Sequence, residues 1–540
     1  MTKIFIIFTM IVLMFLPSAL FAGGARESAG NRVPEITIFT TTEAYDPIRY
    51  EAAFMIGDAW EELGFSVNVQ PMEFSALLQA FYDEQNFDVT ILGWSGRVDR
   101  LDPQHFLGTL HGEQIDLGAN NPGGFVNARY DELFVAQGRE FNADSRRQFV
   151  LEMQEIAARE NPVDVLFYRD EVVGYNSEKF SDFVVMAGES LYNEWTPMSV
   201  RPLTSDRILT IGTPQEPDNI NPVSSTSVWG WKFMRQYYDK LVRLSPEIEP
   251  IPWAAEEIIE VDATTIDVRV RSGMRFHDGR PVTAEDVAFS YQYNIDVDYA
   301  YFRPFYSVID SIEVLDNLTV RFNLEAPSAS FITVTMSQIP ILPKHVWEGI
   351  QNPADLAPDQ IPTVGSGPFM FDQYDRGEYK RLVTFTDHFN ADNIHIDGVE
   401  YIIYADSEGV FTGLLTGQID MTAWRMEPGQ IPLAEQQANV EVVSVGDFGY
   451  YHMTYNTRRA PFNNTAVRQA LSHAVDRDTI IDVLLQGLGE PGYSVVAPIN
   501  SFWHNPDVTR YDYDMARARE ILAEAGYTWD SSGRILAPAN

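Results

Sequence analysis

Apolar positions between residues 36 and 93 follow two periods, one typical of strands and one typical of helices. The predicted elements are, in order, a strand at 36–39, a helix at 47–63, a strand at 66–70, a helix at 74–83 and a buried strand at 88–93. Gly64 follows the first helix at the position where a left-handed residue commonly ends one. Strands that alternate with helices predict a parallel, doubly wound sheet.

From about residue 207 the pattern becomes a strict alternation of apolar and polar positions. Residues 266–271 and 318–324 alternate in this way, which indicates antiparallel strands with one face in water. Between them, Thr283 and Asp286 have the spacing of a capping box, so a helix is expected to begin there and run through Tyr293. The middle of the chain is therefore α+β, unlike both ends.

Helical spacing returns at 465–486, with a break near Asp478, and again at 514–525. The pattern predicts no strand after the last helix and no helix before the strand at 36–39. Joining the two ends would give an ordinary helix–loop–strand unit. We therefore predict that the strand at 36–39 pairs beside the strand at 66–70 and packs against the last helix.

Composition limits the classes of partner. The chain has 540 residues, 45% of them hydrophobic, which is enough for two or three domains with their own cores. Its net charge of −39 argues against nucleic acid or an anionic membrane as a partner, because both are polyanions. The absence of cysteine excludes disulfides, thiolate metal sites, a cysteine nucleophile and a lipid-modified N-terminal cysteine.

The first residues have the pattern of a secretory signal peptide. Lys3 precedes an apolar run at 4–16, and a cleavage site is expected after Ala22. Residues 23–33 then resemble a flexible leader. These features predict export to the periplasm without a lipid anchor.

Four segments carry a more specific pattern: Phe-His-Asp-Gly-Arg-Pro-Val-Thr-Ala-Glu-Asp at 276–286, Gly-Ser-Gly-Pro-Phe at 365–369, Pro-Phe-Asn-Asn-Thr-Ala-Val-Arg-Gln-Ala-Leu at 461–471 and Ala-Arg-Ala-Arg-Glu-Ile-Leu-Ala-Glu-Ala-Gly-Tyr at 516–527. Together they resemble the extracellular solute-binding proteins of family 5, the peptide/nickel-type receptors of ABC importers. The resemblance implies a two-lobed periplasmic-binding-protein-like fold, α/β with α+β, with an extra subdomain in the first lobe.

The order of the segments departs from that family. Segments like 207–540 come first in the family and segments like 33–203 come last, so this chain looks circularly permuted, with the cut inside the second lobe. On this interpretation residues 34–170 and 451–540 form the second lobe, and 171–450 form the first, with the subdomain at about 262–362. A rearranged gene or a fusion of two partial copies is the alternative.

The loop at 93–103 is the best candidate for a binding site. It follows a buried strand, and ligands of doubly wound sheets bind beyond the carboxyl ends of strands. The candidate residues are Trp94, Ser95, Arg97, Asp99 and Asp102. A guanidinium can clamp the carboxylate of a peptide bidentately, and the resemblance implies that an acidic residue of this loop takes the ligand amine. Either aspartate can be that residue, and Arg97 and Asp99 can instead pair with each other.

A second set of candidates faces this loop from the first lobe, according to the resemblance. These are Ser227 and Trp229, and also Trp424 and Arg425. Tryptophan faces suit the apolar side chains of a peptide and the rings of a sugar equally well. As an alternative, these aromatic residues belong to the wall or the core.

The chain has no recognisable catalytic or metal-binding motif. His105 and His111 lack a ligand spacing, and Gly93-Trp-Ser-Gly96 is not the Gly-x-Ser-x-Gly nucleophile elbow. We therefore expect a monomeric, non-catalytic receptor without a cofactor that closes on a short peptide and docks on ABC permease subunits. Two segments, near 165–173 and 450–455, are expected to join its lobes. An oligosaccharide receptor of the same fold and a secreted hydrolase remain as alternatives.

Overall fold

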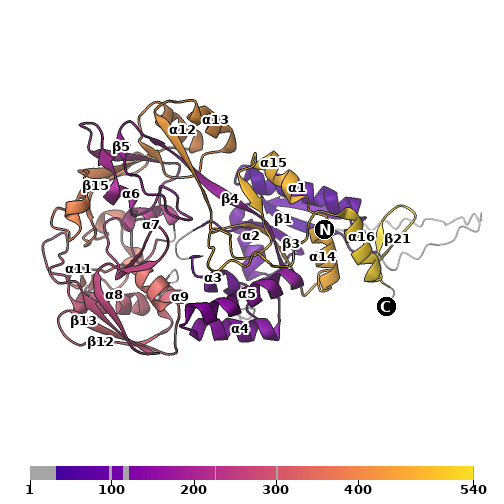
Figure 1. The fold of residues 1–540 in the computed structure, drawn as a ribbon, viewed down its shortest axis with the longest axis horizontal. Coiled ribbons are helices and arrows are strands. Elements are labelled where there is room, and N and C mark those ends of the chain that lie inside the picture. Colours follow the sequence, from indigo (N-terminus) through magenta and orange to yellow (C-terminus); the bar gives the residue numbers. More distant parts are fainter. Residues whose placement is uncertain (1–31, 97–99, 113–120, 226, 300–301, 539–540) are drawn as a thin grey trace, which may run out of the picture.

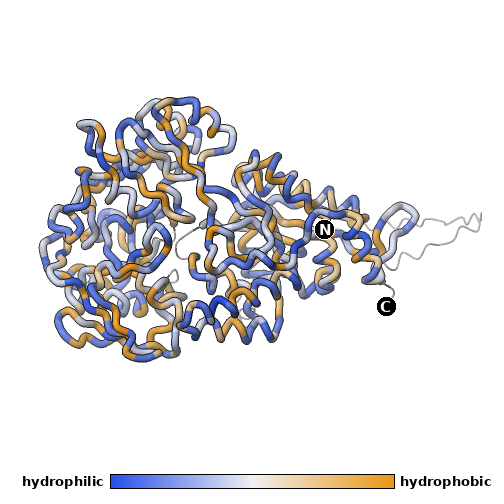
Figure 2. Tube along the Cα trace, in the orientation of Figure 1, coloured by the Kyte–Doolittle hydropathy of each residue, from blue (hydrophilic) through white to orange (hydrophobic). Residues whose placement is uncertain are grey.

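The structure is a computed structural model that describes residues 32–96, 100–112, 121–225, 227–299 and 302–538. Figure 1 shows a larger body and a smaller one joined by the long strand β4. The predicted signal peptide and most of the leader lie outside the described residues. Hydrophobic and hydrophilic positions alternate along the elements of both bodies (Figure 2).

One mixed sheet runs through the molecule in the order β14-β15-β16-β7-β17-β4-β19-β3-β1-β2. The strands are Phe369–Asp375, Tyr379–Thr384, Gly398–Ile403, Ile208–Thr213, Met421–Thr422, Val163–Asn176, Tyr451–Tyr455, Val89–Gly93, Ile36–Thr41 and Val67–Met72. The first five belong to the first lobe and the last four to the second lobe. The strand between them, β4, belongs to both.

The strand β4 connects the lobes because its two halves have different partners. Val163–Phe167 pairs with β19 of the second lobe, and residues 167–169 pair with β20 (Gly489–Pro491). Residues 170–176 pair with β18 (Val440–Gly446) beside the first lobe. The chain crosses a second time between β18 and β19, so two adjacent segments join the lobes.

The second lobe is the doubly wound unit that the first residues predict. Strand β1 pairs in parallel with both β2 and β3. The helices are α1 (Pro47–Glu62), α2 (Phe74–Leu78), α3 (Gln104–Gly108), α4 (Ala128–Arg139), α5 (Ala143–Glu160), α14 (Thr465–His473), α15 (Arg477–Leu484) and α16 (Met515–Glu524). The helix expected at 74–83 is not uniform, because α2 continues as the π-helix η1 (Gln79–Asp83).

Both ends of the chain meet in this lobe. Ile36 and Ile38 of β1 share a buried core with Ala518, Ile521 and Leu522 of α16. The pairing of β1 with β2 is thus confirmed, and α16 contributes to the core on which β1 packs. The contact extends outward to β21 (Thr528–Trp529) and β22 (Ile535–Leu536), since Arg32 forms a β-bridge with Leu536 and an ion pair of 3.3 Å with Asp530.

The first lobe adds a separate four-stranded antiparallel sheet in the order β10-β11-β13-β12. Its strands are Ala255–Asp262, Thr265–Val270, Thr319–Leu324 and Ile309–Val314. The helix α8 (Ala284–Asp296) covers it, and the predicted capping box is confirmed, because Thr283 N donates to Asp286 Oδ2 at 3.0 Å.

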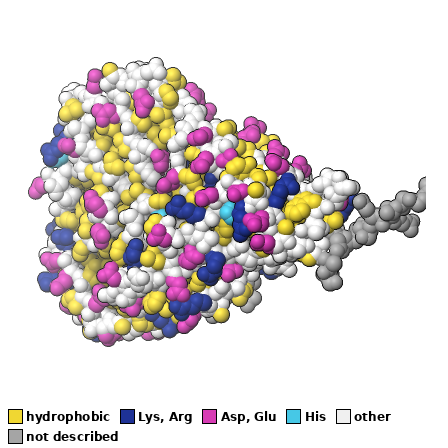
Figure 3. Space-filling model, turned by 45° about the vertical axis from the view of Figure 1, so that its right-hand side comes forward, with side chains coloured by type: hydrophobic (Ala, Val, Ile, Leu, Met, Phe, Trp, Pro, Cys, Tyr) yellow, Lys and Arg dark blue, Asp and Glu magenta, His cyan; other side chains and the backbone are white. Residues whose placement is uncertain are grey.

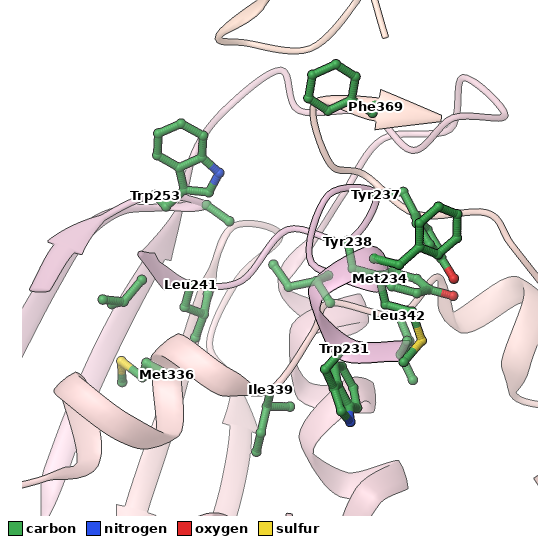
Figure 4. Packing of buried hydrophobic residues seen from close by; sticks show 14 of the residues in the cluster. Trp231, Met234, Tyr237, Tyr238, Leu241, Trp253, Met336, Ile339, Leu342 and Phe369 are labelled. Carbon is green, nitrogen blue, oxygen red and sulfur yellow. The ribbon is translucent and has the colours of Figure 1, made fainter. Parts of the chain in front are cut away.

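The core of the first lobe gathers around α7 (Val228–Met234). Figure 4 shows part of it, where Trp231 and Met234 of this helix lie near Leu342. Two further helices, α12 (Ser407–Leu415) and α13 (Ile431–Glu435), pack with β18 and the second half of β4 in a smaller core. Acidic side chains are scattered over the surface among basic ones (Figure 3).

Candidate functional site

The loop that begins at Trp94 lies directly on the second crossing segment. Trp94 N donates to the carbonyl oxygen of Tyr450 at 2.8 Å. Two residues further, a Cβ added at Gly96 would lie 1.7 Å from Asp447 Oδ1 and 3.0 Å from Phe448 N, so the loop passes close to this segment at Gly96 as well. The loop therefore begins in contact with the segment that joins the lobes.

An arginine fixes the Trp94 side of this loop. The guanidinium of Arg100 lies 4.8 Å from the centre of the Trp94 ring, and Arg100 Nη1 donates to the carbonyl oxygen and the hydroxyl of Ser95 at 2.6 and 3.1 Å. Such a cation–π contact holds the indole in one orientation. Trp94 itself is half-buried.

Asp102 is committed to a structural contact. Its oxygens accept from Arg146 Nη1 and Nη2 of α5 at 2.8 and 2.6 Å, and its side chain is 6% exposed. Gln104 N also donates to Asp102 Oδ1 at 2.9 Å. This carboxylate therefore holds the end of the loop against the second lobe. Arg97 and Asp99 lie outside the described residues.

The candidates of the first lobe come together at the carboxyl end of β17. The rings of Trp229 and Trp424 are 5.1 Å apart between centres. Ser227 caps α7 by accepting from Trp229 N, and Trp229 Nε1 donates to Gln215 Oε1 at 2.9 Å. Trp229 is 5% exposed and packs in the core of the first lobe, while Trp424 is half-buried.

Arg425 takes part in a buried charge cluster at the junction of the lobes. Its Nη2 lies 3.1 Å from Glu171 Oε1 on β4 and 3.8 Å from Asp447 Oδ2 on the second crossing segment. Burial, with the nearby charge of Glu171, raises the pKa of Asp447 to about 6 against the opposing effect of Arg425. The guanidinium thus links both crossing segments to the first lobe.

Two members of this cluster, Glu171 and Asp447, were missed in the sequence. The signal for Glu171 was the polar run 169–171, which interrupts an otherwise apolar strand. Asp447 gave no signal, because its position beside Gly96 depends on the pairing of β19 with β3.

The described residues hold no group of three metal-ligating side chains close enough to bind an ion. Within the same part of the chain, none of the helices combines the length and apolar character needed to cross a bilayer.

The sequence model of the bacterial extracellular solute-binding proteins, family 5 middle, matches residues 249–539. This is more than half of the 540 residues. The chain belongs to this family. Family 5 consists of binding proteins rather than enzymes, and the resemblance seen in the motifs at 276–286 and 461–471 is confirmed.

Curated relatives of this family 5 chain are named after different ligands. The oligopeptide-binding protein AppA of Bacillus subtilis is 29% identical over 336 residues, 61% of each chain. The heme-binding protein A of Haemophilus influenzae is 28% identical over 54% of this chain and 57% of its own. The dipeptide-binding protein of Escherichia coli is 26% identical over 54% and 57%. The chain spans about three fifths of the length of these relatives.

Solved structures show the same mixed α/β periplasmic-binding-protein fold. AppA of Bacillus subtilis in complex with a nonapeptide has a TM-score of 0.50 and 27% identity, covering 61% of this chain and 66% of that one. NikZ of Campylobacter jejuni with Ni(L-His) has a TM-score of 0.50 and 21% identity, covering 62% and 66%. Because NikZ is so distant, its likeness extends to the fold alone.

Proposed function

We propose that this family 5 protein is the substrate-binding component of an ABC importer and captures a short peptide between its two lobes. The observation that carries the proposal is the contact of the Trp94 loop with the segment that joins the lobes. A ligand on that loop touches the place where the lobes move relative to one another, so it can favour the closed form. The closed form then docks on permease subunits.

The proposed contacts divide between the lobes. Trp94 and Ser95 present a ring and a hydroxyl, and Arg97 clamps the ligand carboxylate. Asp99 takes the ligand amine, because the oxygens of Asp102 are occupied by Arg146. Trp424 closes the site from the first lobe, backed by Trp229.

Native mass spectrometry of the purified protein would identify a ligand that copurifies. A short peptide recovered intact supports the proposal, whereas an oligosaccharide would move it to the alternative receptor. Affinity for that peptide should then fall in Arg97→Ala and in Asp99→Ala, with Arg207→Ala, on the exposed surface, as the control. Unchanged affinity in both site variants would remove this loop from the mechanism.

We further propose that the chain is exported to the periplasm by residues 1–22. N-terminal sequencing of the protein recovered from the periplasm should begin at Gly23. An intact Met1 or retention inside the cell would contradict this.

We also propose that the chain is circularly permuted relative to its family. Support comes from the β-bridge between Arg32 and Leu536, which brings the two ends together, and from the exposure of residues 203–206 where the family order would begin. Opening an exposed loop and closing adjacent termini costs little.

A variant in which the two segments are put back into the order of the family tests the permutation. It would begin at Asp206, run to Leu536, continue through a short Gly/Ser linker into Arg32 and end at Thr204. We expect it to fold with a similar melting temperature and to bind the same ligand. If the variant with the family order stays unfolded, the proposal is contradicted.

A further inference from the structure

The two lobes also touch at a place away from the segments that join them. Ala329 N, which follows the four-stranded sheet of the first lobe, donates to the carbonyl oxygen of Gly138 in the second lobe at 3.1 Å. Gly138 lies in the last turn of α4, and Figure 1 shows α4 and α5 beside α9 (Arg303–Tyr306) and away from β4. This hydrogen bond joins backbone atoms, so it depends on how the two lobes lie relative to each other.

The acceptor belongs to the end of a helix, where carbonyl groups lack a partner within the helix. The carbonyl oxygen of Gln137 accepts from Glu140 N at 3.4 Å, just beyond the end of α4. The carbonyl oxygen of Gly138 accepts from Ala329 of the other lobe instead. Gly138 is half-buried, so water can replace Ala329 when the lobes separate. The contact is therefore reversible.

The donor is held in place by the core of the first lobe. Ala329 lies in a turn in which Phe331 N donates to the carbonyl oxygen of Ser328 at 3.2 Å. Phe331, the first residue of η4 (Phe331–Thr335), is fully buried, and its ring centre lies 5.5 Å from that of Phe322 on β13. The turn is thus fixed to the first lobe and does not follow α4 if the lobes rotate apart.

The acceptor is connected to the candidate binding loop. Arg146 of α5 donates from Nε to Gln137 Oε1 at 3.0 Å, and its two other nitrogens donate to Asp102 at the end of that loop. Gln137 directly precedes Gly138 and is fully buried. A short chain of buried contacts therefore runs from the loop to the carbonyl oxygen that Ala329 meets. The loop and this end of α4 are parts of one rigid unit.

We propose that the hydrogen bond between Ala329 and Gly138 is a clasp, through which the part of the first lobe that carries the four-stranded sheet favours the closed form. The inference rests on the proposed receptor function and gives a role in closure to a part of the first lobe outside the candidate site. One backbone hydrogen bond changes the ratio of closed to open molecules about 2- to 10-fold. A clasp of this strength favours closure and still allows the ligand to leave.

Distances between two spin labels measure the clasp without a ligand. The chain contains no cysteine, so Ser145→Cys on α5 and Ser311→Cys on β12, both exposed, carry the only labels in pulsed electron paramagnetic resonance. Ala329→Pro removes the N–H donor, whereas Ala329→Gly keeps it and is the matched control. The ratio of short to long distances should fall about 2- to 10-fold in Ala329→Pro alone. Equal distance distributions in the two variants would overturn the inference.

A disulfide tests the same contact if Ala329→Pro does not fold. Gly138→Cys and Ala329→Cys can pair only with each other in the otherwise cysteine-free chain. A Cβ added at Gly138 would lie 3.6 Å from Gln104 Oε1, which is an ordinary contact. Mild oxidation should cross-link this pair at least about tenfold faster than the control pair Gly138→Cys and Ser311→Cys, because a disulfide needs backbones in close proximity. Equal rates for the two pairs would overturn the inference.

A tryptic peptide mixture separates the clasp from the proposed function. Faster cross-linking of the pair at 138 and 329 in its presence supports both, because a bound ligand favours the closed form. Cross-linking that exceeds the control but does not respond to the mixture supports the clasp and contradicts peptide capture.

Discussion

The carbonyl oxygen of Trp94 lies so close to Gly449 that a Cβ added to that glycine would come within 1.9 Å of it. The obstacle is backbone, which cannot rotate away as a side chain can. Gly449 belongs to the segment that joins the lobes, and Trp94 opens the proposed binding loop. The position of the loop therefore depends on the conformation of this connection.

Gly449→Ala should move the Trp94 loop away from the crossing segment. We expect a loss of about 1–3 kcal/mol in the free energy of unfolding and a roughly tenfold weaker ligand affinity. Urea unfolding and calorimetry measure the two effects. Gly429→Ala is the matched control, because no atom lies within 4 Å of its added Cβ. Equal behaviour of the two variants would contradict the close contact.

Asp102→Ala should destabilise the second lobe strongly. It leaves the guanidinium of Arg146, 5% exposed, without its carboxylate, and breaking a buried pair in this way costs about 3–5 kcal/mol. Urea unfolding of Asp102→Ala can be compared with that of Asp397→Ala, which removes an exposed pair with Arg207. We expect Asp397→Ala to lose far less free energy of unfolding than Asp102→Ala, because water screens exposed charges.

Glu194 should make the first lobe sensitive to acid. Burial raises its pKa, but Lys240 and Arg243, at 2.8 and 2.9 Å, outweigh this effect and lower the pKa to about 2. A depressed folded pKa stabilises the fold above the unfolded value of about 4.5, and this stability is lost as the pH falls towards 2. The contribution is on the order of 3 kcal/mol. In Glu194→Gln the free energy of unfolding should fall less steeply between pH 4.5 and 2 than in the unchanged protein. An equally steep fall in urea unfolding at these pH values would contradict the prediction.

Asp447 should have the opposite dependence on pH. Burial and Glu171 raise its folded pKa to about 6, so ionisation as the pH rises from about 4 to above 6 destabilises the fold. Asp447→Asn cannot ionise, so its stability relative to the unchanged protein should increase over this range. Urea midpoints at pH 4, 5, 6 and 7 measure the difference. A constant difference would show that Asp447 does not titrate there.

Local pattern in the sequence was enough to predict much of the fold. The spacing of apolar residues gave the strands at 36–39 and 88–93, and the capping box gave the start of α8, because these signals depend on neighbours within a few residues. The π-helix after α2 was not predicted, since helical spacing does not distinguish the two kinds of turn.

The family and the position of the candidate binding loop could also be predicted from the sequence, since both follow from residue types at short spacing. The tertiary structure alone decided which groups that loop has available. Asp102 meets Arg146, which is 44 residues away, and Arg425 meets Glu171 across the junction of the lobes. Gly96 and Gly449 matter because strands from opposite ends of the chain bring them against Asp447 and Trp94. Such pairings depend on sheet order and on long-range packing, which no local period in the sequence encodes.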